Sequence, residues 1–163
     1  MEYPKHEPRA QKQRFHQAAI RQAYKPKLPF RTVEGIESDA WKRLDYGAIG
    51  LLMEFYRKFN GRNRANLSVT YREVKHKMSS LIFTRWIWQL IGFGFLDVKR
   101  WGRLQRKCSI YGLSDRWRRL SEEPQKLDEI ENLLREIDQL KRERGSSDKR
   151  ERIWAVRLRV LRM

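Results

Sequence analysis

Five cationic side chains fall within a span of nine residues near the middle of the chain. They are Lys99, Arg100, Arg103, Arg106 and Lys107, with Trp101 among them. Contacts between lysine or arginine and phosphate supply much of the affinity of proteins for DNA. We therefore expect this segment to bind the backbone of a nucleic acid.

A second group of polar residues precedes this segment. Arg85 and Gln89 are four residues apart, and their side chains suit bidentate hydrogen bonds to guanine and adenine in the major groove. Ser79 and Ser80 lie just upstream and offer hydroxyls to phosphates or base edges. We also expect backbone contacts from the cations Arg62, Arg64, Arg72, Lys75 and Lys77.

Two short helices are predicted to position these groups. Thr70 and Glu73 have the spacing of a capping box, which marks a helix start. Ser79 and Ser80 then interrupt the helix and provide a second N-cap, followed by a helix over residues 81–91. Either Gly92 or Gly94 suits the left-handed residue that ends a helix.

The spacing within this second helix predicts which side chains are buried. Its core-facing residues are Phe83, Ile87 and Leu90, and its outward-facing residues are Ile82, Arg85, Trp86 and Gln89. Exposed tryptophan is more typical of a protein interface than of the major groove. Trp86 and Trp88 therefore raise the alternative of a protein partner.

Strands follow the second helix. Residues 95–100 and 108–113 read as two strands joined by a turn at Gly102, and residues 66–69 read as a short first strand. A long amphipathic helix over residues 38–59 precedes them and ends at Asn60 and Gly61. Strand, helix, turn, helix and basic hairpin, in that order, predict a winged helix-turn-helix.

Helical segments continue after the hairpin. Ser114 and Asp115 cap a short helix, and Pro124 opens a longer one that ends near Gly145. The apolar residues of the longer helix have a and d spacing: Leu127, Ile130, Leu134 and Ile137. This helix either packs on its own domain or pairs two copies in a homodimer through residues 124–144.

The last segment has two possible structures. Trp154, Leu158 and Leu161 fit one helical face, whereas Val156, Leu158 and Val160 fit a strand, and periodicity does not choose between them. The fold class predicted for the whole chain is mainly α with a small β-hairpin (α+β). Its parts are a flexible basic arm (1–37), the winged helix-turn-helix (38–120), an amphipathic helix (121–145) and a basic tail (146–163).

Charge is concentrated in the predicted winged region. Residues 38–120 contain 18 Lys and Arg against 6 Asp and Glu, so this region has a net charge of +12 out of +17 for the chain. Such a concentration favours a polyanionic partner. The longest apolar run is far shorter than the roughly 20 residues that span a bilayer, and the start of the chain has no apolar signal core. We expect no membrane association.

Catalysis has little support. The three histidines have no ligand spacing, Cys108 is the only cysteine, and no glycine-rich loop cradles a phosphate. Asp97 and Lys99 match part of a nuclease element, but no second carboxylate accompanies them. We therefore expect a reduced, cytoplasmic protein that is not an enzyme and has no cofactor or metal.

Four stretches also resemble a known family. They are Phe55–Asn63, Leu67–Tyr71, Gly94–Leu96 and Ile110–Trp117. They are similar to motifs of bacterial winged helix-turn-helix proteins, mostly uncharacterised, that are found in prophages and other mobile elements. The resemblance covers residues 41–120 and implies a winged helix and, by analogy of fold, binding to double-stranded DNA.

These observations predict a DNA-binding winged-helix protein that regulates transcription or replication. The resemblance implies that it belongs to a mobile element. Two alternatives stay open. The winged helix could serve as a scaffold for a protein partner through Trp86 and Trp88, or the basic surface with its aromatic residues could bind RNA.

Overall fold

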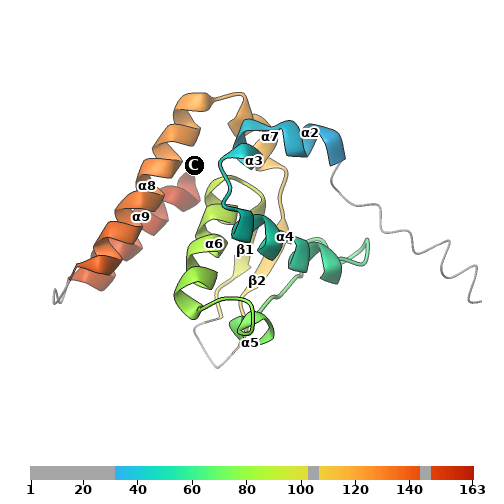
Figure 1. The fold of residues 1–163 in the computed structure, drawn as a ribbon, viewed down its shortest axis with the longest axis horizontal. Coiled ribbons are helices and arrows are strands. Elements are labelled where there is room, and N and C mark those ends of the chain that lie inside the picture. Colours follow the sequence, from blue (N-terminus) through green and yellow to red (C-terminus); the bar gives the residue numbers. More distant parts are fainter. Residues whose placement is uncertain (1–31, 103–106, 144–147) are drawn as a thin grey trace, which may run out of the picture.

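The computed structural model describes residues 32–102, 107–143 and 148–163, and it is mainly helical with one small antiparallel sheet. Its elements are α2 (Thr32–Glu37), α3 (Asp39–Lys42), α4 (Tyr46–Lys58), α5 (Tyr71–Val74), α6 (Ser80–Gly92), β1 (Leu96–Arg100), β2 (Ile110–Leu113), α7 (Arg116–Ser121), α8 (Pro124–Arg142) and α9 (Lys149–Arg162). α6 is central and contacts α4, α8, α9 and β1 (Figure 1). This architecture agrees with the predicted α+β class.

The helix predicted over residues 38–59 is divided in the structure. α3 ends at Lys42 and α4 begins at Tyr46, because Asp45 has an extended backbone (φ −61°, ψ 144°). The Asp45 N–H donates instead to the side-chain Oε1 of Gln89, at 3.3 Å. α4 keeps the predicted apolar stripe, and Ala48, Leu51, Leu52 and Phe55 are all buried.

The turn chemistry of α5 and α6 is as predicted. The Glu73 carboxylate accepts hydrogen bonds from the backbone N–H and the hydroxyl of Thr70, at 3.3 and 2.8 Å. The Ser79 hydroxyl accepts from the Ile82 N–H at the start of α6. After α6, Gly94 has a φ of +79°, which glycine adopts without strain. α5 itself is shorter than predicted, since it ends at Val74 before a turn.

The sheet is a two-stranded hairpin. β1 pairs with β2 in antiparallel register, with Leu96 opposite Leu113 and Val98 opposite Tyr111. The strand predicted over residues 66–69 is reduced to a single bridge, between Leu67 and Tyr111. The second strand also starts later than predicted, at Ile110.

α8 and α9 form a helical hairpin that packs on the rest of the chain (Figure 1). The buried residues of α8 are Leu127, Ile130, Leu133, Ile137 and Leu140. They belong to the same core as α4, α6 and the sheet. The apolar stripe that suggested a homodimer is therefore covered by α6, α7 and α9 of the same chain.

The C-terminal segment is a helix, which settles the choice left open by periodicity. Its buried residues are Val156 and Val160, with Ile153 half-buried one turn earlier. The predicted face of Trp154, Leu158 and Leu161 is wrong in part, because Leu158 is exposed. Arginines and apolar residues alternate along this segment, so their spacing alone does not show which side of the helix is buried.

Most of the predicted N-terminal arm lies outside the described residues, and its last part, residues 32–37, forms α2. Within the described ranges, no helix combines the length and the apolar character needed to cross a bilayer.

Candidate nucleic-acid interface

Gln89 lies inside the protein, so its predicted outward position is wrong. Its side chain is only 8% exposed. The amide Nε2 donates to Oδ2 of Asp45 at 3.0 Å, while Oε1 accepts from the Asp45 backbone. Because both ends of the amide are used within the chain, Gln89 holds the α3–α4 turn against α6. Helical spacing alone does not reveal that this turn covers the C-terminal half of α6.

Arg85 also faces groups of its own chain. Its guanidinium lies 3.2 Å from Oδ2 of Asp138 on α8 and 3.5 Å from Oδ2 of Asp45. These three residues line a cavity of about 120 Å³ between α6, α8 and the α3–α4 turn. The two carboxylates compensate the charge of Arg85, although its side chain is 42% exposed.

The two tryptophans of α6 differ in position. Trp88 is 3% exposed and stacks on Trp101 of the hairpin, with ring centroids 5.5 Å apart. The prediction that both tryptophans are exposed is therefore wrong for Trp88. Trp86 is half-buried against Gly47 of α4, where a Cβ atom would lie 1.9 Å from the indole ring.

The start of α6 is the part of this helix that remains open. Ser79, Ser80 and Leu81 are exposed there. A helix start carries free backbone N–H groups and a partial positive charge, both of which favour phosphate. Ser79 already caps one of these N–H groups through its hydroxyl.

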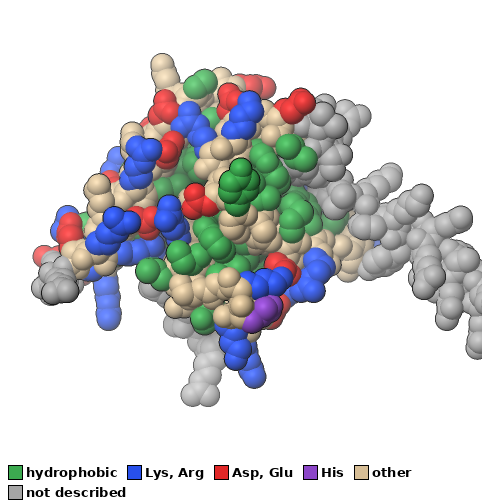
Figure 2. Space-filling view, in the orientation of Figure 1, with side chains coloured by type: hydrophobic (Ala, Val, Ile, Leu, Met, Phe, Trp, Pro, Cys, Tyr) green, Lys and Arg blue, Asp and Glu red, His purple; other side chains and the backbone are tan. Residues whose placement is uncertain are grey.

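Cations flank this helix start on α5 and in the turn that follows it. Arg72 and Lys75 are exposed, and neither has an ion-pair partner within the described part of the chain. Lys77 is exposed but lies 2.6 Å from the Glu54 carboxylate, and this hydrogen bond lowers the pKa of Glu54. Figure 2 shows basic side chains over α5, at the bottom of the molecule in this view.

The hairpin contributes a second group of cations. Lys99, Arg100 and Lys107 are exposed, while Arg103 and Arg106 lie outside the described residues. Lys99 has Asp97 at 3.7 Å. For Arg100 and Lys107, the described ranges contain no carboxylate within ion-pair distance.

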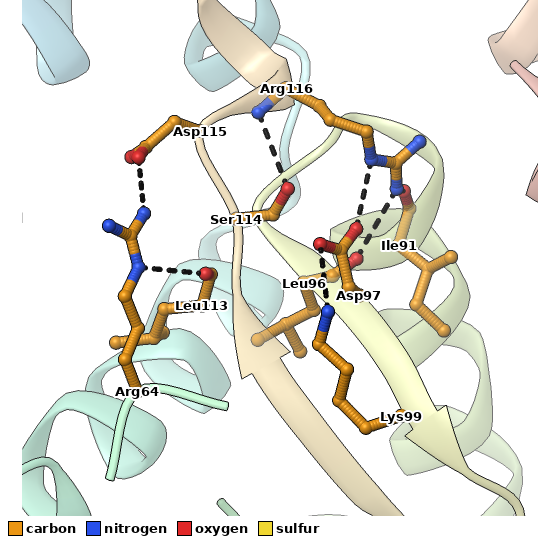
Figure 3. Close-up of polar contacts among 9 residues, drawn as sticks. All are labelled: Arg64, Ile91, Leu96, Asp97, Lys99, Leu113, Ser114, Asp115 and Arg116. Carbon is orange, nitrogen blue, oxygen red and sulfur yellow. Dashed lines mark hydrogen bonds and ion pairs between the residues drawn. The ribbon is translucent and has the colours of Figure 1, made fainter. Parts of the chain in front are cut away.

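The loop after α4 contains two predicted cations, of which the Arg64 side chain has partners within the chain and the Arg62 side chain has none among the described residues. Arg64 donates from Nε to the Leu113 carbonyl at 3.1 Å and forms an ion pair with Asp115 (Figure 3). It therefore joins the loop to the end of β2. Arg62 is exposed beside Gly61, whose φ of +86° confirms the predicted turn.

Arg116, which the sequence did not single out, explains the polar residues on β1. Its Nε donates to Asp97 at 3.0 Å and its NH2 donates to the Ile91 carbonyl at 2.9 Å (Figure 3). Asp97 is thus part of a structural network that joins the end of α6, β1 and the start of α7. No local sequence signal marks this contact, because the two residues are nineteen positions apart.

The predicted residues therefore separate into two groups. Five of them have partners within the chain: Gln89, Arg85, Arg64, Lys77 and Lys99. The group without such partners, among the residues that the structure describes, consists of Arg62, Arg72, Lys75, Arg100 and Lys107. A scan against protein-family models and searches of curated proteins and of solved structures found no match to this chain.

Proposed function

We propose that this chain is a winged-helix protein that binds double-stranded DNA mainly through the phosphate backbone. The order of elements supports the fold assignment. α4, α5 and α6 are followed by the β1–β2 hairpin as the wing, and the Leu67–Tyr111 bridge stands for the short first strand. In such folds, one helix approaches a groove while the wing contacts the adjacent backbone.

The observation that carries the proposal is the distribution of exposed, uncompensated cations. They lie on α5, on the wing and in the loop after α4, whereas Arg85 in the middle of α6 is neutralised by carboxylates. This distribution favours sequence-independent contacts with phosphates over base reading. α6 would then approach the duplex with its N-terminal end rather than lie in a groove along its side.

The test is a triple variant in which Lys75, Arg100 and Lys107 are each changed to Ala. Each lost phosphate contact reduces the steepness of log K against log salt by about 0.9. We expect the slope of duplex binding, measured by fluorescence anisotropy, to become shallower by nearly three units (about 2.7).

The matched control is Arg119→Ala. Arg119 is an exposed cation on α7, away from α5 and the wing (Figure 1). The control should leave the slope unchanged. Equal slopes for wild type and the triple variant would remove these cations from the interface.

A second candidate function is binding to a protein through α4. Tyr46 at the start of this helix is 94% exposed, and Met53 is 44% exposed two turns later. Gly50 lies between them and has no heavy atom within 4 Å of an added Cβ. Trp86 packs beside this face at Gly47 (Figure 2 shows apolar side chains over α4 and α6). An absence of salt-dependent binding to any nucleic acid would favour this candidate.

A further inference from the structure

α9 runs along α6 in a direction that its contacts define. Val160 lies near the end of α6, since a Cβ on Gly92 would be 3.3 Å from its Cγ1. One turn earlier, the Arg157 guanidinium lies 4.8 Å from the centre of the Trp88 ring. α9 therefore runs parallel to α6, so the start of α9 lies toward the start of α6.

The next contact brings α9 to the hairpin. Trp154 meets Trp101 edge to face, with ring centroids 5.9 Å apart, and Trp101 stacks in turn on Trp88. Trp101 directly follows β1, which leads toward the hairpin turn. These three tryptophans fix the first half of α9 beside the base of the hairpin.

Arg150 lies one helical turn before Trp154, and residues four apart in a helix share a face. Arg150 therefore continues the face of α9 that carries Trp154, and it is exposed. Figure 1 shows the start of α9 at the lower left of the molecule, and α5 with the start of α6 at the bottom centre. The cations Arg100 and Lys107 lie on the hairpin itself.

The charges of α9 are compensated unequally. Arg152 pairs with Glu143 at 3.2 Å, and Arg159 lies 3.8 Å from Glu136 on α8. Arg150 has no such carboxylate among residues 32–102, 107–143 and 148–163. An exposed cation with no neighbouring carboxylate is free to pair with a phosphate, and each such contact adds to the salt-dependent affinity.

We infer that the first turn of α9, through Arg150, is a further phosphate-binding element that contacts the same duplex as the hairpin. This inference rests on the proposed function and extends it to the C-terminal helix. The tryptophan contacts hold the element in place before DNA arrives, so its contact requires no ordering of a free tail. DNA bound at the hairpin would pass Arg150 on the side of α9.

The experiment compares Arg150→Ala with Arg162→Ala. Arg162 is also an exposed arginine on α9, but it lies at the opposite end of the helix. Binding to a duplex is measured by fluorescence anisotropy over a range of salt concentrations. We expect Arg150→Ala to make the slope of log K against log salt shallower by about one unit, and Arg162→Ala to leave it unchanged.

Two further variants separate direct contact from a change in folding. Arg150→Lys keeps the charge and should keep the wild-type slope. Combining Arg150→Ala with Lys107→Ala should lower the steepness by about two units, since independent contacts add. If the wild-type protein binds duplex DNA and Arg150→Ala shows the same salt slope as the wild type, the inference is overturned and the proposed function stands. If wild type does not bind duplex DNA, the proposed function fails and the inference fails with it.

Discussion

Changing Gln89 to Ala decides whether this residue supports the fold or reads DNA. The variant loses the hydrogen bonds at 3.0 and 3.3 Å that join the Gln89 amide to Asp45. Asp45 then has an unsatisfied backbone N–H at the α3–α4 turn. Loss of one partner of a buried hydrogen bond costs about 1–3 kcal/mol.

The Asp45 carboxylate reduces this cost, because its side chain is 42% exposed and water replaces one lost bond. We therefore expect the free energy of unfolding to fall by about 1–2 kcal/mol. Urea unfolding followed by circular dichroism measures this change. The matched control is Gln139→Ala, since Gln139 is an exposed glutamine in the last turn of α8.

The affinity of the same variant for duplex DNA distinguishes the two roles of Gln89. Under our account, Gln89→Ala retains the wild-type affinity for a duplex at a temperature where both proteins are folded. A glutamine that pairs with adenine would instead contribute about 1–3 kcal/mol of discrimination. A variant of normal stability that has lost affinity or base preference would refute the assignment of Gln89 to the turn.

Three further predictions concern the stability of the fold. Gly94→Ala should lower the free energy of unfolding by about 1–3 kcal/mol, because φ is +79° and the added Cβ would lie 2.6 Å from the backbone nitrogen of Trp117. Gly50→Ala, where the Cβ meets no atom within 4 Å, should instead stabilise α4 by about 0.5–1 kcal/mol; equal effects on urea midpoints would contradict this reasoning. The Lys77 hydrogen bond lowers the pKa of Glu54 below its ordinary 4.5, so the pair stabilises the fold above that pH and loses its effect as pH falls through the lowered pKa. Glu54→Gln should cost about 0.5–1 kcal/mol at neutral pH and nothing in strong acid, and a cost that persists in acid would exclude the ion pair as its cause.

Local sequence signals predicted the elements well where the interactions are local. The Thr70–Glu73 capping box, the Ser79 cap and the glycines at 61 and 94 all have the predicted geometry. Each of these depends on residues within a few positions of one another. The hairpin and the helix that begins at Pro124 follow from equally local patterns.

The predicted site fared differently because its burial is decided by distant segments. Gln89 and Arg85 are polar residues on a helix, which by themselves indicate an exposed face. The structure places Asp45, forty-four positions before Gln89, against the Gln89 amide, and Asp138 on α8 beside the Arg85 guanidinium. The sequence contains no signal for these pairings. Trp88 is buried for the same reason, since α9 and the hairpin meet over it.

The most direct test of the central claim is the salt dependence of binding by the wild-type protein. Fluorescence anisotropy would compare the affinities for duplex DNAs of one length and several sequences with those for single-stranded DNA and structured RNA. Five uncompensated cations (Arg62, Arg72, Lys75, Arg100 and Lys107), each meeting one phosphate, predict a slope of about −4.5 for the duplex, with little dependence on its sequence. Arg150 as a sixth contact brings the predicted slope to about −5.4. A slope near zero for the duplex, or tighter binding to RNA, would contradict the account.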